Sequence, residues 1–332
     1  MRKTRKDKKK VKKVIKNIFF RLLILLVLGG ICLLLFFLCQ GFKKSVWDGK
    51  NNINLVIQME RTFIYTFHPD DEILNIISLP NDLYLETARE YGEYKLKNIY
   101  QLGEVEKVGG GELLRMSLQN LFVVPIDGYI VKTPKIQSAS WRTKSQSENL
   151  EKGRLTSLYF CLLTRNYETN LSGWDLIRVF NHLNKLKFNN INLVKIEETI
   201  LFKKEELADG SEVFRLETLQ IDDFSQKQFT DKHFLNEGLK LSVFNATNYS
   251  GLAKNASRLL KNIGGEIVSS KDEDQTFERS ILYYNNEEQK KTYSFKKIRQ
   301  IFQIEEVLLD SEIEGDVRLV LGRDYLERYY LK

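Results

Sequence analysis

The chain has 332 residues and a formal net charge of +7. Eleven of its 51 Lys and Arg residues lie in residues 1–21 together with one Asp, which leaves 40 basic and 43 acidic residues in the remainder. A remainder with a net charge of −3 lacks the basic surface of a protein that binds phosphate backbones, so we expect no nucleic-acid partner. The three His and three Cys residues show no zinc-ligand spacing.

The N-terminal segment predicts a membrane anchor. Residues 22–39 carry no charge and would span about 27 Å as a helix, close to the thickness of the bilayer hydrocarbon. A cleaved signal peptide has a shorter apolar region and a small-residue cleavage site, and a core helix rarely follows a dense basic block. We therefore predict a cytoplasmic tail (1–21), one transmembrane signal anchor (22–42) and about 290 residues outside the cell membrane.

Residues 43–196 predict a first domain, which begins with a polar spacer over 43–52. Its first three strands are apolar enough to be buried on both faces, as in a sheet covered by helices. Later signals are a glycine run before an amphipathic helix and a Ser-x-x-Asp helix start. The predicted strands cover 53–59, 62–67, 72–79, 125–132 and 191–196, and the predicted helices follow Gly109–Gly111 and Ser172.

The glycine run Gly109–Gly111 has two interpretations. Glycines before a helix can cradle phosphate. The run lacks the spacing of the known phosphate-binding motifs, so a simple helix-entry loop is the favoured interpretation.

Residues 236–330 predict a second, smaller domain, and the charged residues 197–235 predict the connection to it. The second domain has the order β-α-β-β-α-β, which is typical of a split α/β sandwich. The whole chain is thus expected to be α/β (α+β). The predicted strands cover 239–244, 266–270, 279–284 and 316–322, and the predicted helices begin at Ser250 and at residue 289.

Two stretches of the second domain resemble the C-terminal domain of LytR-CpsA-Psr envelope proteins. They are SVFNATNYSGLAKNASRLLKNIGGEIV and DVRLVLGRDY, which lie within residues 239–325. Asn245 and Thr247 fit the family's turn after the first strand, and Gly251-Leu252-Ala253 fits its helix start. These residue types are those of turns and caps, which favours a structural role over a catalytic one.

Residues 53–196 resemble a degenerate LytR-CpsA-Psr catalytic domain. The matching segments, in the family's order, are TFIYTFHPDDEILNIISLPNDLYLE, YKLKNIYQLGE, GGGELLRMSLQNLFVVPIDGYIV and TNLSGWDLIRVFNHL. The resemblance implies transfer of a glycopolymer from a polyprenyl pyrophosphate carrier to the cell wall. It also implies arginines that clamp the pyrophosphate, carboxylates that hold Mg²⁺, and an apolar pocket for the lipid.

This chain departs from the family at the residues that would do the chemistry. The Pro-Arg-Asp motif is Pro80-Asn81-Asp82, the Asp-Thr motif is Arg61-Thr62, and the Lys-Ile-Asn motif is Lys95-Leu96-Lys97. The family's later Arg-x-Arg motif has no counterpart. The weak candidates for a site are Asp82, Lys95 and Arg61 for catalysis, Lys95 and Lys97 for pyrophosphate or lipid, and Asp82 for metal.

Two functions follow from this pattern. The favoured one is a non-catalytic scaffold or binding module of the bacterial cell envelope, with no cofactor. The alternative is a Mg²⁺-dependent glycopolymer phosphotransferase with a rearranged site. Either protein would be single-pass, with the lipid bilayer as one partner and a polyprenyl-linked glycan, peptidoglycan or another envelope protein as the other.

Overall fold

The computed structural model of the chain describes residue 29 and residues 45–132, 167–206, 210 and 212–331. The predicted tail (1–21) lies outside the described residues, as does the predicted anchor (22–42) except for Gly29. Within the described residues, no helix has the length and apolar character needed to cross a membrane. The expected α/β fold is confirmed: eight α-helices and four sheets occur in this part of the chain.

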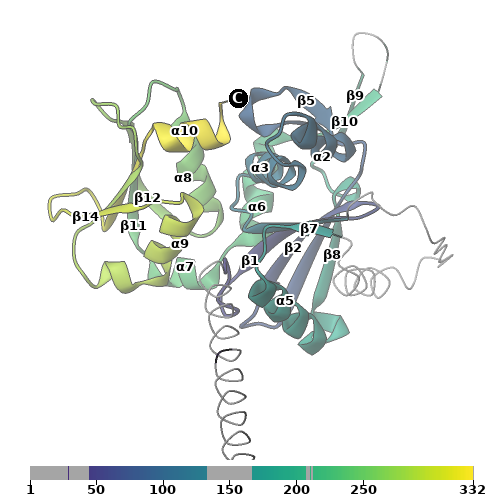
Figure 1. Cartoon of the computed structure of the whole chain (residues 1–332), viewed down its shortest axis with the longest axis horizontal. Helices are drawn as coiled ribbons and strands as arrows, with labels where there is room; N and C mark the ends of the chain where they lie inside the picture. Colours follow the sequence, from purple (N-terminus) through teal and green to yellow (C-terminus); the bar gives the residue numbers. More distant parts are fainter. Residues whose placement is uncertain (1–28, 30–44, 133–166, 207–209, 211, 332) are drawn as a thin grey trace, which may run out of the picture.

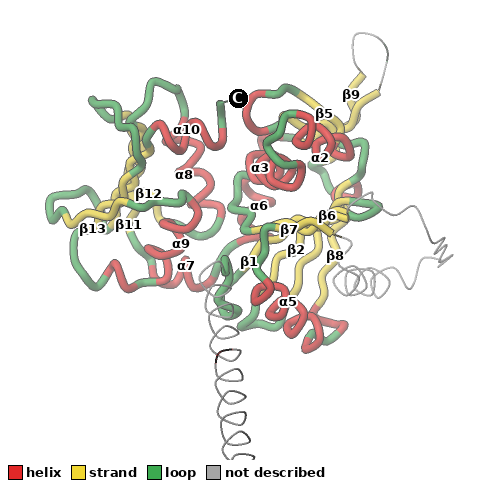
Figure 2. Tube along the Cα trace, viewed as in Figure 1, coloured by secondary structure: helices red, strands yellow, loops and turns green. Residues whose placement is uncertain are grey.

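The N-terminal domain is built on a six-stranded sheet between two layers of helices (Figure 2). The pairs β1–β6 and β3–β8 are parallel and the other neighbours are antiparallel. Across the sheet the strands are β7 (Tyr167–Thr169), β6 (Gly128–Lys132), β1 (Ile53–Gln58), β2 (Thr62–His68), β3 (Ile73–Leu79) and β8 (Ile191–Lys195).

The central strands are buried on both faces, as their apolar sequences predicted. Alternate residues of β1 point to opposite sides of the sheet, so Val56 joins one core and Leu55 the other. Helices α2 (Leu96–Val105) and α3 (Gly110–Phe122) cover the first face. Helix α5 (Gly173–Lys185) covers the second.

Helix α5 begins with the predicted cap. The Ser172 hydroxyl accepts a hydrogen bond from the Asp175 backbone N–H, and the Asp175 carboxylate accepts one from the Ser172 backbone N–H. The same carboxylate is fully buried and also accepts a hydrogen bond from the backbone N–H of Trp47 at 3.1 Å. Residues 45–51, predicted to be a polar spacer, therefore pack against the domain, with the Trp47 ring in its core.

Two short hairpins extend the N-terminal domain at the end of the sheet where β3 finishes. The first joins β4 (Tyr84–Glu86) to β5 (Glu93–Lys95). The second joins β9 (Phe202–Glu206) to β10 (Glu212–Leu216), and a bridge between Leu83 and Phe214 links the two hairpins. Part of the predicted connecting segment is thus a piece of the N-terminal domain.

Helices α6 (Ile221–Phe229) and α7 (Lys232–Glu237) lie between the two domains (Figure 1). Helix α6 packs on α3 of the N-terminal domain and on α8 (Leu252–Asn262) of the C-terminal domain. The Ser225 hydroxyl donates to the Phe122 carbonyl at 2.6 Å. One continuous apolar core therefore runs from the sheet of the first domain into the second.

The C-terminal domain contains a five-stranded sheet with helices α8, α9 (Tyr293–Ile301) and α10 (Arg323–Tyr329). The predicted order β-α-β-β-α-β is present, and it gains two elements that the sequence did not indicate, β14 and α10. The last strand, β15, lies in the middle of the sheet. Across the sheet the strands are β12 (Glu266–Asp272), β11 (Lys240–Asn245), β15 (Val317–Leu321), β13 (Ile281–Tyr284) and β14 (Glu306–Leu309).

Candidate functional site

The residues predicted to form a site gather at one end of the six-stranded sheet. The Arg61 Nε donates a hydrogen bond to the Leu79 carbonyl at 3.1 Å, and the Asn81 side chain donates to the Glu60 carbonyl at 2.8 Å. The backbone N–H of Lys97 donates to the Asn81 carbonyl at 3.1 Å. These contacts tie the β1–β2 turn, the end of β3 and the start of α2 into one edge, which we call the β3 rim.

The arginine of the β3 rim, Arg61, is already engaged in an ion pair. The Arg61 guanidinium forms an ion pair with Glu197, and both side chains are about one-third exposed (33% and 29%). A pyrophosphate clamp needs a guanidinium fork that is available to phosphate oxygens. Arg61 could bind a phosphate only by giving up Glu197.

The two lysines do not converge on a common point. The Lys95 ammonium lies 5.5 Å from the centre of the Tyr84 ring, a cation–π distance, whereas the Lys97 side chain is exposed at the first turn of α2. Asp82 lies in the turn between β3 and β4 and is half-buried. In the described ranges, no group of three or more His, Cys, Asp or Glu side chains is arranged to hold a metal ion. The residues around Asp82 therefore do not supply the carboxylate set that the family's Mg²⁺ would need.

The glycine run before α3 allows the helix to pack closely against its neighbours. The backbone N–H of Gly110 donates to the Glu104 carboxylate at 2.7 Å, so the helix start already has an anionic partner. A Cβ at Gly111 would overlap the Tyr129 ring, and one at Gly110 would overlap Tyr100. The glycines let α3 approach α2 and β6 closely, which supports the helix-entry interpretation.

The Pro-Ile-Asp-Gly motif carries a residue whose role the sequence did not reveal. Asp127 is 4% exposed, and its carboxylate receives the Lys297 ammonium at 2.6 Å and the Asn54 backbone N–H at 2.9 Å. Lys297 belongs to α9 and is itself 8% exposed. This buried ion pair joins the two domains, and no local pattern could have predicted it because the partners are 170 residues apart.

Further polar contacts join the C-terminal domain to α6 and to the N-terminal domain. Arg258 of α8 binds Asp222 of α6 through two hydrogen bonds of 3.0 Å. Burial opposes ionisation of Asp222, but the hydrogen bonds from Arg258 and Asn262 outweigh it and lower the pKa of this carboxyl. Arg89, beside β4, donates to the carbonyl of Arg328 at the end of α10. The two domains are therefore held by charged groups as well as by the shared core.

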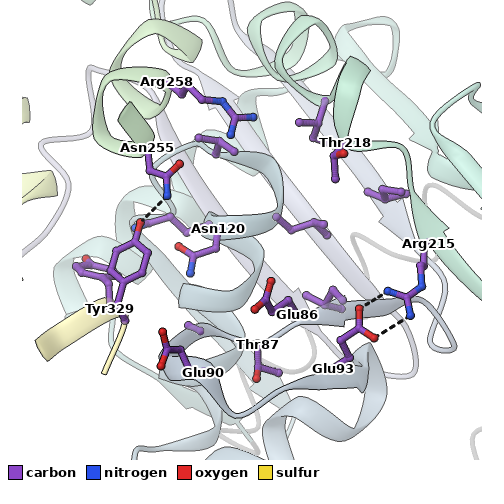
Figure 3. A pocket seen from close by; sticks show the side chains of 18 of the residues that line it. Glu86, Thr87, Glu90, Glu93, Asn120, Arg215, Thr218, Asn255, Arg258 and Tyr329 are labelled. Carbon is purple, nitrogen blue, oxygen red and sulfur yellow. Dashed lines mark hydrogen bonds and ion pairs between the residues drawn. The ribbon is translucent and has the colours of Figure 1, made fainter. Parts of the chain in front are cut away.

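A cavity of about 580 Å³ opens between the two domains. Its walls come from β4, the end of α3, the β9–β10 hairpin, α8 and α10. In Figure 3 the side chains of Asn120 and Glu86 lie between the Arg215–Glu93 pair on one side and Asn255 on the other. Tyr84 also lines the cavity. The predicted site residues Arg61, Asp82, Lys95 and Lys97 do not line it.

The chain is similar to several solved structures and, over part of its length, to one family model. No curated protein sequence matches it. Similar solved structures include TagT from Bacillus subtilis, with 16% identity and a TM-score of 0.39 over 55% of this chain and 91% of that one. TagU from the same species shows 11% identity and a TM-score of 0.37 over 54% and 95%. The LytR-CPS2A-psr family protein YwtF (TagT) with bound octaprenyl pyrophosphate lipid shows 14% identity and a TM-score of 0.38 over 56% and 93%.

The family comparison identifies the second domain. The model of the LytR_C family, described as "LytR cell envelope-related transcriptional attenuator", matches residues 238–325. These residues include all five strands of the C-terminal sheet together with α8 and α9. The domain predicted from the Asn-Ala-Thr, Gly-Leu-Ala and Leu-Gly-Arg-Asp-Tyr motifs is confirmed, and residues 238–325 of this chain form a LytR C-terminal domain.

Proposed function

We propose that this chain is an extracytoplasmic protein of the bacterial cell envelope, anchored by residues 22–42, whose LytR-CpsA-Psr-like domain is a non-catalytic scaffold. The LytR C-terminal domain supports the envelope assignment. The charge pattern of residues 1–42 supports the membrane topology. The bilayer and another envelope component, either a glycan or a protein, are the partners that this assignment implies.

One observation carries the non-catalytic assignment. At the β3 rim, Arg61 is engaged by Glu197, and Asn81 stands where the family has arginine and uses its amide to hold the Glu60 carbonyl. The groups that would stabilise charge on a leaving pyrophosphate are thus replaced or already paired. Losing one such preorganised contact costs about 3–4 kcal/mol of transition-state stabilisation, so losing several leaves little catalysis.

The alternative, a phosphotransferase with a rearranged site, rests on a different observation. Arg61 and the backbones of Asn81 and Lys97 do meet at one rim, so a ligand could draw their side chains together. This mechanism requires Arg61 to exchange Glu197 for phosphate and requires Mg²⁺ to be completed by ligands beyond Asp82. Fewer of the observed contacts support this function than support the non-catalytic scaffold.

Calorimetry with geranylgeranyl pyrophosphate tests the proposal. The full chain in detergent is titrated with and without Mg²⁺, and Lys95→Ala is compared with Lys227→Ala, an exposed lysine on α6 that serves as the control. We expect no Mg²⁺-dependent binding and no difference between the two variants. Binding that requires Mg²⁺ and weakens about tenfold in Lys95→Ala alone would favour the phosphotransferase.

A further inference from the structure

We propose that the cavity between the two domains binds an uncharged oligosaccharide. The cavity is separate from the β3 rim, so this inference does not rest on the proposed function. Its volume of about 580 Å³ lies within the range of about 300–1,000 Å³ that is usual for small-molecule sites. It also lies at a domain interface, where such sites are frequent.

The charge of the cavity argues against an anionic ligand. Among the residues that the structure describes, four basic and five acidic side chains line it, a net of −1. Arg215 forms two hydrogen bonds with Glu93, and Lys203 pairs with Glu217. Arg258 is held by Asp222, and Arg89 by the carbonyls at the end of α10. With every lining cation engaged in this way, a phosphate or pyrophosphate would have to displace a carboxylate or a backbone carbonyl.

Aromatic rings form one wall. Tyr330 and Tyr249 lie with ring centres 5.3 Å apart, and both are half-buried, so part of each ring faces the cavity. Tyr325 and Tyr329, which also line the cavity, are buried and pack with ring centres 4.9 Å apart. Two buried rings thus support two accessible ones. Tyrosine rings offer an apolar face with a polar tip, which suits the C–H faces and hydroxyls of a sugar ring.

Planar polar groups face this wall. The Asn120 amide makes no hydrogen bond within the described part of the chain, although the residue is half-buried at the end of α3. Among the described residues, the Asn255 side chain makes one hydrogen bond, a long contact of 3.5 Å with the Tyr330 hydroxyl. An amide both donates and accepts hydrogen bonds, as neighbouring sugar hydroxyls do. The Glu86 carboxylate, which also lines the cavity, can accept hydrogen bonds from sugar hydroxyls.

These features select among ligand classes. An apolar ligand would cover the Asn120 amide and the Glu86 carboxylate without offering them hydrogen bonds, which opposes its binding. An anionic ligand would be repelled by the net negative charge of the cavity lining. A neutral, hydroxyl-rich ring with apolar faces satisfies the amides, the carboxylate and the tyrosines together.

Saturation-transfer NMR on the full chain in detergent tests the proposal. The probes are the uncharged tetrasaccharides of N-acetylglucosamine, glucose and galactose, with inorganic pyrophosphate as competitor. We expect at least one tetrasaccharide to bind, to persist in excess pyrophosphate, and to bind at least tenfold more weakly in Asn120→Ala and Tyr330→Ala. Asn98→Ala, an exposed asparagine on α2, is the matched control and should bind as the native chain does.

Several results would overturn the proposal. They are no transfer to any of the three probes, displacement of the sugar by pyrophosphate, or equal affinity in Asn120→Ala and the native chain. Tyr330→Phe removes only the hydroxyl and should keep most of the affinity, which guards against a folding defect in Tyr330→Ala. A negative result here leaves the calorimetric test at the β3 rim unaffected, because the two experiments probe different sites.

Discussion

Asp82 and Asp127 lie in two motifs of the same domain, and the fold gives them different partners. Asp82 lies in a surface turn of the β3 rim. The side chain of Asp127 is 4% exposed and holds a lysine of the other domain. Asp127 thus serves domain docking, whereas Asp82, the aspartate expected at a catalytic centre, forms no ion pair with any residue that the structure describes.

Breaking the buried pair should have the largest effect. Lys297→Met removes the cation and leaves the Asp127 carboxylate buried without its partner, which costs about 3–5 kcal/mol. Urea denaturation should show a lower midpoint for this variant. Lys296→Met, at the exposed neighbouring position, should change the free energy of unfolding by less than about 0.5 kcal/mol. Equal midpoints for the two variants would show that the pair does not hold the domains.

The glycine run before α3 provides a second test, because we assign it a role in helix packing and not in phosphate binding. Gly111→Ala places a methyl group against the Tyr129 ring and should destabilise the chain by about 1–3 kcal/mol. Gly173→Ala, at the start of α5, meets no atom within 4 Å and should be neutral or slightly stabilising. Thermal unfolding of both variants checks this, and an unchanged melting temperature in Gly111→Ala would contradict the packing role.

The Arg258–Asp222 contact should make domain docking sensitive to acid. The pKa of Asp222 is lowered in the folded chain, so its contribution to stability is present above the unfolded pKa of about 4 and is lost as the pH falls below it. Because both side chains are about one-third exposed, the contribution is at most about 1 kcal/mol.

The matched pair for this test is Asp222→Asn and Asp223→Asn, since Asp223 is exposed on the same turn of α6. Asp222→Asn should be less stable at pH 7 and should lose less stability between pH 5 and pH 2 than the native chain. If Asp222→Asn lost as much stability between pH 5 and pH 2 as the native chain, Asp222 would be excluded as the source of the acid sensitivity.

A similarly small effect is expected at the β3 rim. Arg61→Ala breaks an ion pair whose partners are about one-third exposed, so the free energy of unfolding should fall by no more than about 1 kcal/mol. Chemical denaturation of Arg61→Ala beside Lys195→Ala, which loses the exposed Glu198 pair, should give similar values. A loss above about 2 kcal/mol would mean that the rim is as important to folding as the domain contact.

The sequence predicted most of the regular structure for physical reasons. Continuous apolar runs specified β1, β2 and β3 to within one or two residues, and the Ser172 cap specified the start of α5. The missed elements carry weaker local signals. Strand β14 is short and largely exposed at the sheet edge, and α6 has a charged, mixed sequence that becomes helical between two packed helices.

The candidate site was only partly predictable. Arg61, Asn81 and Lys97 lie at one rim because antiparallel pairing brings the start of β2 beside the end of β3. It could not show that Arg61 pairs with Glu197 or that Asp127 binds Lys297, since such contacts depend on tertiary packing. The cavity could not be predicted from the sequence either, because its walls come from both domains.

Transfer of a glycan from a polyprenyl pyrophosphate carrier to cell-wall acceptor, measured with the purified full chain in the presence of Mg²⁺, tests the central claim most directly. The account predicts no transfer above background and no difference between the native chain and Asp82→Ala. Mg²⁺-dependent transfer that disappears in Asp82→Ala would contradict it and would make the β3 rim an active site.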